Sequence, residues 1–323
     1  MAWPSHTVMP VEILDLRHFT SADLRPLLEH EARVWSRLLS WDYRSSADMI
    51  LRYVDAKILP GYAAVDHGHI RGYSFFVYEG SKGVIGDLYA MPNGNDSLEL
   101  EEQLVTNVIA TLQQSPGIHR IEAQLLVHDA GQVAEPFLQE GFTRHPRIFM
   151  SLPFTAQLAL KPRDVPSGIE LRPWQEQDYQ ASAAVIAAAY RGHIDSDIND
   201  QYRSLNGSLR FLNNIVRFPG CGIFDPTASF VVIDRHTQQL VGVLLCSRVK
   251  DDVGHVTQVC LVPELRRLGI GEALIAACAA NLKQRGFKAL SLTVTEANSR
   301  AVELYKRLGF HSDRVFDAFV WEG

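Results

Sequence analysis

Hydrophobic and polar positions follow the same order in the two halves of the chain. Each half begins with a short apolar strand that is followed by a helix. This helix is predicted over residues 22–38 in the first half and 177–190 in the second. Apolar, β-branched and aromatic runs then predict strands at 62–65, 71–78 and 84–90, with counterparts at 229–234, 241–248 and 255–262. A long helix (98–114 or 271–285), a strand, a short helix and a final strand complete each half. This order predicts two α+β domains, each with a mixed, mostly antiparallel β-sheet flanked by helices.

Three matching segments indicate that the halves are two copies of one domain. The sequence "LRHFTSAD" at 16–23 matches "LRPWQEQD" at 171–178, and "FLQEGF" at 137–142 matches "YKRLGF" at 305–310. Between these pairs, "GYSFFVYEGSKGVIGDLYAMP" resembles "GVLLCSRVKDDVGHVTQVCLVP". Three pairs in the same order indicate an internal repeat of domain length.

The repeat divides the chain into two domains and a linker. The first domain spans 1–155 and the second 169–323. Residues 156–168 end in "KPRDVPSG", whose prolines, glycine and charges are typical of a linker. The offset between the copies grows after the first matching pair, which predicts an insertion around 190–225 in the second copy.

The composition is that of a soluble globular protein, with 46% hydrophobic and 21% charged residues. No apolar run approaches the ~18 residues of a membrane-spanning helix, and the N-terminus lacks the basic and apolar regions of a secretion signal. The cysteines form no C-x-x-C pair, so we expect reduced thiols in a cytoplasmic protein that does not bind a membrane. They are Cys221, Cys246, Cys260 and Cys278.

Charge is distributed unevenly along the chain. The net charge is −6, with a balance of −7 in residues 1–155 and +1 in residues 156–323. Neither half is basic, so we expect no nucleic-acid partner. The twelve histidines are scattered without ligand spacing, so we expect no metal site.

The turn at 266–271, "RRLGIG", joins a predicted strand to a predicted helix. The first turn of a helix has unsatisfied N–H groups and a partial positive charge, and glycines allow close approach of an anion. Two arginines add positive charge. The pattern predicts a pyrophosphate site, although a plain strand-to-helix turn with solvated arginines would look the same.

A second motif, "EANSRAVELYKRLGF" at 296–310, follows one helix and one strand later. The two motifs in this order and at this distance resemble the GNAT superfamily of acyl-CoA-dependent N-acyltransferases. The resemblance covers essentially all of residues 168–323. It implies acetyl-CoA as the cosubstrate and a small-molecule or peptide amine as the acceptor.

The resemblance also assigns roles to individual residues. The backbone of the strand would pair with the pantetheine arm of acetyl-CoA, and the turn would wrap its pyrophosphate. Asn298 would bond to the cofactor, and the Tyr305 phenol would protonate the departing thiolate. The expected cofactor-binding residues are Val259, Cys260, Leu261, Arg266, Arg267, Leu268, Gly269, Ile270, Gly271, Glu272, Asn298 and Tyr305. The structural alternatives are a half-buried helix aromatic for Tyr305 and a helix N-cap for Asn298.

The general base is not evident from the motifs. Ribosomal-protein N-terminal acetyltransferases of the superfamily carry a glutamate where this chain has Thr293. His255 and Glu296 are the candidate catalytic bases. His255 would otherwise be an edge histidine, and Glu296 would otherwise support the start of the short helix.

The first copy lacks every group to which the second copy owes its chemistry. After Pro92 the first copy continues "NGNDS", which is acidic where a diphosphate needs positive charge. Aligned through "GF", Asn298 corresponds to Ala130 and Tyr305 to Phe137. We therefore expect the first domain to be a degenerate, structural copy that binds no acetyl-CoA.

These features predict an acetyl-CoA-dependent N-acetyltransferase that acts by direct attack in a ternary complex, as a monomer or homodimer. The alternatives are a non-catalytic acyl-CoA-binding module and a mycothiol-synthase-like acetyltransferase, since two GNAT-like halves also resemble mycothiol synthases. The inserted segment is expected to shape the acceptor pocket. Its Asp195, Asp197 and Asp200 are possible amine anchors or solvated helix-cap residues.

Overall fold

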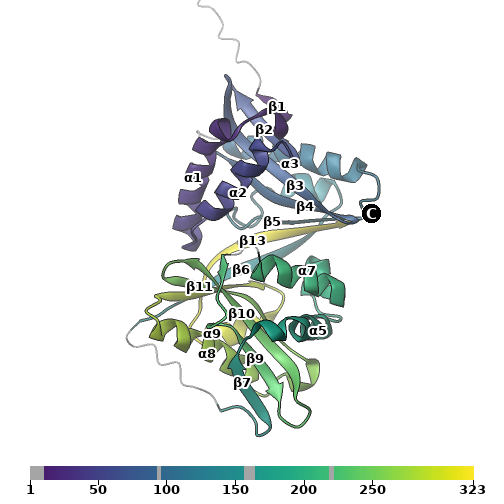
Figure 1. The fold of residues 1–323 in the computed structure, drawn as a ribbon. Helices are drawn as coiled ribbons and strands as arrows, with labels where there is room; N and C mark the ends of the chain where they lie inside the picture. Colours follow the sequence, from purple (N-terminus) through teal and green to yellow (C-terminus); the bar gives the residue numbers. More distant parts are fainter. Residues whose placement is uncertain (1–10, 93–95, 156–163, 218–221) are drawn as a thin grey trace, which may run out of the picture. The chain divides into compact units, whose positions relative to one another are not determined.

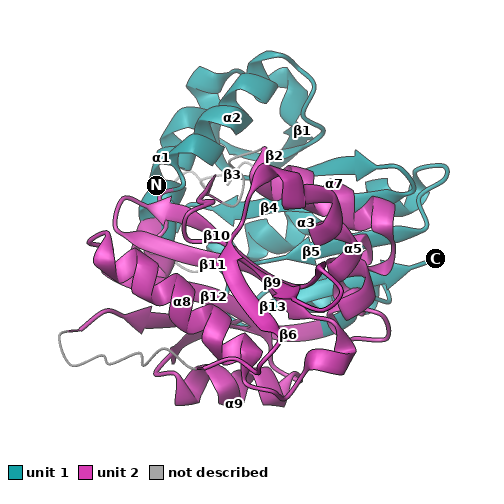
Figure 2. Cartoon of the chain, turned by 60° about the horizontal axis from the view of Figure 1, so that its bottom comes forward, with its two compact units in different colours: residues 1–35, 43–144, 317–323 teal, residues 36–42, 145–316 magenta. Residues whose placement is uncertain are grey.

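A computed structural model describes residues 11–92, 96–155, 164–217 and 222–323. The chain forms two compact units (Figure 2). Unit 1 comprises residues 1–35, 43–144 and 317–323, and unit 2 comprises 36–42 and 145–316. Within the described part of the chain, no helix combines the length and apolar character needed to cross a membrane.

Unit 1 is a mixed sheet with helices on both faces. Its strands run in the order β1-β2-β3-β4-β5-β13, with β4 and β5 parallel and the remaining pairs antiparallel. Helices α1 and α2 pack on one face of the sheet, and α3 and α4 pack on the other (Figure 1). The elements are β1 (Glu12–Asp15), α1 (Ser21–Leu39), α2 (Arg44–Asp55), β2 (Gly61–Asp66), β3 (His69–Glu79), β4 (Lys82–Ala90), α3 (Asp96–Gln114), β5 (Arg120–Gln124), α4 (Ala134–Gln139) and β13 (His311–Glu322).

Unit 2 repeats this architecture. Its strands run in the order β6-β12-β11-β10-β9-β7, with β11 and β12 parallel. Helices α5 and α7 cover one face, and α8 and α9 cover the other. Its elements are β6 (Thr143–Pro153), β7 (Ile169–Pro173), α5 (Tyr179–Ala189), α6 (Asp195–Ile198), η3 (Asp200–Arg203), α7 (Leu205–Val216), β8 (Ile223–Phe224), β9 (Phe230–Asp234), β10 (Gln239–Lys250), β11 (Val253–Leu261), η4 (Pro263–Leu265), α8 (Ile270–Gln284), β12 (Ala289–Thr295) and α9 (Ser299–Arg307).

The last strand of each copy contributes to the other copy's unit. Residues 147–153 of β6 pair with β12 inside unit 2, and residues 318–322 of β13 pair with β5 inside unit 1. The repeat boundary expected at 156–168 is therefore a boundary in the sequence, while the compact units exchange a strand. Residues 156–163 of that linker lie outside the described part of the chain.

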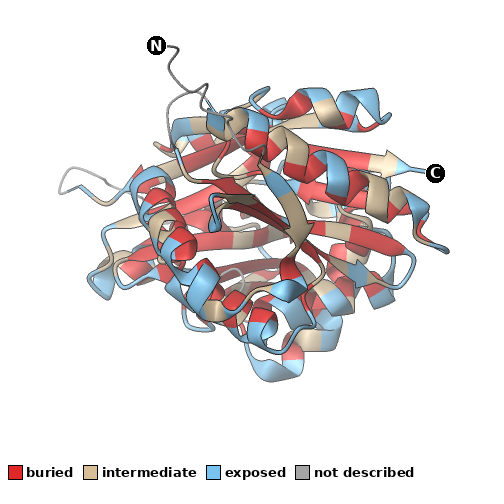
Figure 3. Ribbon diagram, turned by 90° about the horizontal axis from the view of Figure 1, so that it is seen from above, coloured by how far each residue is buried: buried red, intermediate tan, exposed pale blue. Residues whose placement is uncertain are grey.

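The predicted fold class is confirmed, and the insertion is visible as extra elements. The connection from α5 to β9 carries α6, η3, α7 and β8, where the first copy carries α2 alone. Helix α2 was not predicted, although its buried residues Ala47, Ile50, Leu51 and Val54 have the spacing of one helix face. Buried positions are divided between the strands and the helix faces that pack on them (Figure 3).

Candidate active site

The strands β11 and β12 separate partway along their length. They pair from Val253 opposite Ala289 to Val256 opposite Leu292, where the pairing stops. A bulge lies at the same point, because Leu245 and Cys246 of β10 face Gln258 and Val256, leaving Thr257 unpaired. A bulge bends its strand and changes the direction of the residues after it. The second half of β11 therefore has an open edge on the β12 side.

Two backbone N–H groups face this open edge. The N–H of Val262 donates to Val241 on β10, and strand alternation turns the N–H groups of Val259 and Leu261 the other way. Among the described residues, we find no acceptor for either group. Unpaired backbone donors on a strand edge form a ready surface for an extended, amide-containing ligand.

The glycine-rich turn follows directly from this edge. Arg267 and Gly269 adopt left-handed backbone, with φ of 67° and 81°. Gly269 is the N-cap of α8 and supplies no side-chain cap, so the first N–H groups of the helix remain for an external anion. A Cβ built on Gly271 would meet its nearest neighbour, Leu261 Cδ1, only at 3.9 Å, so the turn has open space beside it.

The two arginines of the turn have different surroundings. The guanidinium of Arg266 donates to the carbonyl oxygens of Ala189 and, at 3.4 Å, Leu261. It ties the end of α5 to the end of β11. Arg267 is exposed, so the positive charge offered to a diphosphate comes chiefly from Arg267 and the helix terminus.

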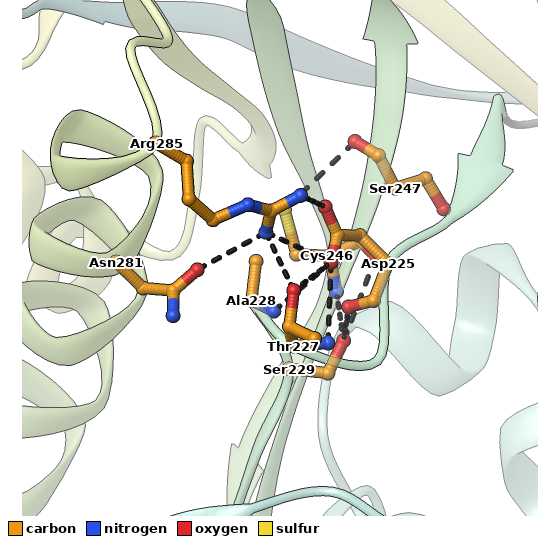
Figure 4. A network of polar contacts seen from close by, with 8 residues as sticks. All are labelled: Asp225, Thr227, Ala228, Ser229, Cys246, Ser247, Asn281 and Arg285. Atoms are coloured by element: carbon orange, nitrogen blue, oxygen red, sulfur yellow. Dashed lines mark hydrogen bonds and ion pairs between the residues drawn. The ribbon is translucent and has the colours of Figure 1, made fainter.

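The far end of α8 is held by a partly buried ion pair (Figure 4). Arg285 donates to both carboxylate oxygens of Asp225, at 3.0 and 2.7 Å, and to Thr227 Oγ1 at 2.6 Å. Burial alone would raise the pKa of Asp225, but hydrogen bonds from Arg285 and Thr227 hold it below its usual value. This network fixes α8, and with it the turn at its start.

Tyr305 lies on α9 and is 8% exposed. Burial raises the pKa of its phenol, and the nearby charge of Asp195 raises it further. The phenol therefore keeps its proton at neutral pH, which is the form that an acid requires. Its ring contacts Phe310, with 5.7 Å between centroids.

Asn298 and Glu296 lie at the turn from β12 to α9. The side chain of Asn298 accepts from the N–H of Ala301 at 3.4 Å, so it serves as the N-cap of α9. Its role toward a cofactor remains a prediction. Glu296 is exposed, and its backbone N–H donates to Pro146 at 2.9 Å.

His255 lies in the closed, paired part of β11, opposite Ser291. It is 5% exposed, its Nδ1 is 2.9 Å from Ser291 Oγ, and the rings of Trp41 and Phe149 contact it. Burial and the charge of Arg147 lower its pKa to about 3. These features argue against His255 as the base that meets an acceptor amine.

Cys260 lies between the two open N–H groups. It is 9% exposed, and burial raises the pKa of its thiol to about 12. The thiol is a weak nucleophile in this form, which agrees with direct transfer rather than an acyl-cysteine. No cluster of three metal-ligating side chains occurs among the residues described.

An aromatic and polar cluster beside Tyr305 was not predicted from the sequence. Tyr190 and Tyr202 stack with ring centroids 4.4 Å apart, and the Tyr190 hydroxyl donates to Gln258 Oε1 at 2.6 Å. Asp195 accepts from Thr295 Oγ1 at the end of β12. The sequence placed Asp195 in the inserted segment, but no pattern linked it to Tyr305.

The first copy opens at the same place, and its own side chains fill the edge. Pairing of β4 with β5 stops at Ile85, and the next open N–H groups belong to Leu88 and Ala90. Asp87 Oδ1 accepts from Leu88 at 2.9 Å, and Glu101 Oε1 accepts from Ala90 at 3.0 Å. No backbone donor at these two positions is left for a ligand.

Glu101 occupies the position of Gly271. Leu112 packs over Gly83 in the first copy as Leu282 packs over Gly254 in the second, which aligns α3 with α8. Glu101 and Gly271 then coincide, each eleven residues before its leucine. Residues 93–95, the first part of the acidic segment after Pro92, lie outside the described part of the chain.

Carboxylates also line a pocket between α3 and α4 of the first copy. The pocket has a volume of about 440 Å³, and Glu99, Glu102 and Glu135 are among its lining residues. Three carboxylates would repel a diphosphate. The counterpart of Tyr305 is Phe137, which is fully buried and stacked on Phe319 at 4.0 Å.

Comparison with known proteins also distinguishes the second copy from the first. Residues 195–310 match the acetyltransferase (GNAT) family. A mycothiol acetyltransferase from Thermobispora bispora is 31% identical over 178 residues, 53% of this chain and 55% of that protein. One from Acidimicrobium ferrooxidans is 25% identical over 98% of this chain and 95% of its own length. A tandem GNAT protein from the clavulanic acid biosynthesis pathway superposes with a TM-score of 0.58 at 13% identity, covering 97% of this chain and 98% of that one.

These similarities cover different shares of the chain. The curated relatives with at least 30% identity are matched over about half of their own length or less. The structural similarity extends over nearly the whole chain and, at its low identity, shows the fold alone. Together they support a mixed-sheet fold present twice, with the family match confined to the second half.

Proposed function

We propose that the chain is an acetyl-CoA-dependent N-acetyltransferase with one working site, in its second half, where residues 195–310 match the acetyltransferase (GNAT) family. The open edge of β11 is the observation that carries this proposal. Val259 and Leu261 offer N–H groups, and the Gly269 turn offers a helix N-terminus at the end of the same strand. An amide-containing arm followed by a diphosphate fits these features in this order.

The chain's own residues can then perform the transfer. Acetyl-CoA supplies a thioester. The N–H groups of β11 can stabilise the oxyanion that forms when an amine attacks it, and Tyr305 can donate its proton to the departing sulfur. The buried, protonated state of Tyr305 supports this role.

The acceptor is proposed to be a primary amine. A mycothiol-related amine is a second, narrower candidate, because relatives named mycothiol acetyltransferase align over half or all of this chain. A non-catalytic acyl-CoA-binding module is the alternative from another class. The polar cluster of Tyr305, Asp195 and Thr295 beside the open edge favours an enzyme.

One experiment separates these functions. Acetyl-CoA is titrated into the full chain by calorimetry, and thiol release is then measured with a panel of amines that includes a mycothiol precursor. The proposal expects binding and amine-dependent release of free thiol. Binding without release for any amine would favour the non-catalytic module, and no binding would remove the proposal altogether.

A further inference from the structure

The segment inserted into the second copy brings a carboxylate to the open edge. Asp195 accepts a hydrogen bond from Thr295 Oγ1, the last residue of β12, and Thr295 is only 1% exposed. The bond holds the carboxylate where β12 has separated from β11. The side chain of Asp195 is 18% exposed, so a ligand can reach it.

Asp195 also acts electrostatically on the groups around that opening. Its charge helps to raise the pKa of Tyr305, Tyr190 and Tyr202, which come from three different elements. A charge that influences all three phenols lies close to each of them. Asp195 therefore belongs to the same cluster as the proposed acid, Tyr305.

A second observation points to a polar ligand in this cluster. Gln258 is 4% exposed, and its Oε1 accepts from Tyr190 at 2.6 Å. Its Nε2 is buried and makes no hydrogen bond of ordinary geometry with a described residue, although Gln258 also acts on the neighbouring Tyr202 phenol. Buried polar atoms are nearly always paired, so an unpaired one marks a place where a further polar group belongs.

We propose that Asp195 binds the ammonium group of the acceptor and accepts the proton that this group must lose. The inference rests on the proposed function and names the base that the sequence left open between His255 and Glu296. It also names the substrate class, an acceptor that is cationic at neutral pH. Aromatic rings of Tyr190 and Tyr202 border the same space and suit a cation.

The proton balance is complete. The ammonium gives one proton to Asp195, and the nitrogen lone pair forms the C–N bond as the C–S bond breaks. Tyr305 protonates the sulfur and is reprotonated by the second nitrogen proton. Asp195 releases its proton to solvent, and His193 Nδ1, 3.6 Å from Asp195 Oδ2 and a quarter exposed, lies on one exit path.

The first arm of the test measures pH dependence in Asp195→Asn. Asparagine keeps an acceptor oxygen for Thr295 but cannot take a proton at neutral pH. For any amine that the wild type uses, kcat/KM at pH 7 should fall about a hundredfold. The deficit should shrink roughly tenfold per pH unit as the pH approaches the pKa of the amine, because the free base then needs no deprotonation.

The titratable and charged groups that face Asp195 could contribute to such a profile. The matched control is Asp197→Asn, which removes the same charge two residues away from a side chain that is 65% exposed. This variant keeps every group facing Asp195 and should follow the wild-type profile. Those groups are His193, Tyr190, Tyr202 and Tyr305, and Cys260 and Arg147 act in turn on these tyrosines.

The second arm measures binding without turnover. Calorimetry with the same amine in the absence of acetyl-CoA should show affinity at least about tenfold weaker in Asp195→Asn than in Asp197→Asn, since an ammonium–carboxylate contact is lost. Acetyl-CoA affinity should be unchanged in both variants. An Asp195→Asn enzyme with the wild-type pH profile, or one that loses acetyl-CoA binding as well, would overturn the inference. A wild type that releases no thiol with any amine would overturn the proposed function itself.

Discussion

The edge of β4 beyond Ile85 and the edge of β11 beyond Val256 are the same part of the fold in two copies. Each begins at a bulge, and each turns two N–H groups toward the opening. In the first copy, Asp87 and Glu101 accept from those groups. In the second copy, the described residues leave them open.

The difference shows how a binding edge can be closed without a change of fold. An unpaired strand edge needs a partner, and carboxylates of the same domain can supply it permanently. The first copy is therefore complete by itself, and its added negative charge repels a diphosphate. The described residues leave the edge of the second copy unpaired, so we expect a ligand that binds there to stabilise the protein.

The largest expected effect comes from giving the second copy the side chain of the first. In Gly271→Glu, the new carboxylate can reach the N–H of Leu261 as Glu101 reaches Ala90, and it adds negative charge at the phosphate turn. Acetyl-CoA affinity measured by calorimetry should fall more than about a hundredfold, which corresponds to about 2.7 kcal/mol.

The matched control changes Glu101, which already occupies the open edge of β4 in the first copy. Glu101→Gln keeps an acceptor for Ala90 and should leave acetyl-CoA affinity as in the wild type. A Gly271→Glu protein that folds and binds acetyl-CoA normally would mean that the turn is not the diphosphate site.

A second substitution transfers the other missing group. Tyr305→Phe gives α9 the residue type that Phe137 supplies in the first copy. Without the phenol proton, kcat should fall about a hundredfold. Acetyl-CoA affinity should change little, because the ring remains. Steady-state kinetics and calorimetry on the same preparation check this split, and unchanged kcat would remove Tyr305 as the acid.

A third substitution tests how much the second motif, residues 296–310, contributes to the stability of the fold. Asn298 caps α9 and corresponds to Ala130 in the first copy. Asn298→Ala should cost about 1 kcal/mol of unfolding free energy in urea denaturation. Full stability in this variant would assign Asn298 to the ligand alone.

The smallest expected effect concerns the first copy, where polar side chains also gather at the bulge. Burial and the charge of Asp87 raise the pKa of Glu31, and the Tyr73 hydroxyl lies between the two carboxylates, 2.8 Å from Glu31 Oε2 and 3.0 Å from Asp87 Oδ2. Because the pKa of Glu31 is higher in the folded state, its protonated carboxyl stabilises the fold. This stabilisation is fully present below the ordinary pKa of glutamate and is lost as pH rises through the raised pKa.

Glu31→Gln stays neutral, so it should remove that loss. Urea denaturation at pH 5 and pH 8 should show a smaller decrease in unfolding free energy for Glu31→Gln than for the wild type. Parallel decreases in the two proteins would show that Glu31 does not titrate differently in the folded state.

The sequence predicts the architecture well, because hydrophobic periodicity and glycine positions act locally. The helices and strands that were predicted lie within a few residues of their predicted bounds, and the predicted turn before α8 is present, with Gly269 in left-handed backbone. The exchange of β6 and β13 between the compact units was not predicted. A strand's periodicity indicates which face is buried but carries no signal for which strand it pairs with.

The parts of the site that belong to a sequence motif could be predicted. The part contributed by the long connection between α5 and β9 could not. Tyr305 and residues 266–271 follow from the motifs, and their roles stay predictions. The position of Asp195 beside Thr295 depends on a contact across 100 residues of sequence. His255 looked exposed near the start of a strand, yet Trp41, from the first half of the sequence, packs against its ring.

The stoichiometry of acetyl-CoA binding to the full chain tests the central claim most directly. Because Asp87 and Glu101 fill the first edge and the second edge is open, calorimetry should find one acetyl-CoA per chain, and none detectable in Gly271→Glu. Two bound molecules per chain, or a single site that survives in Gly271→Glu, would contradict the account.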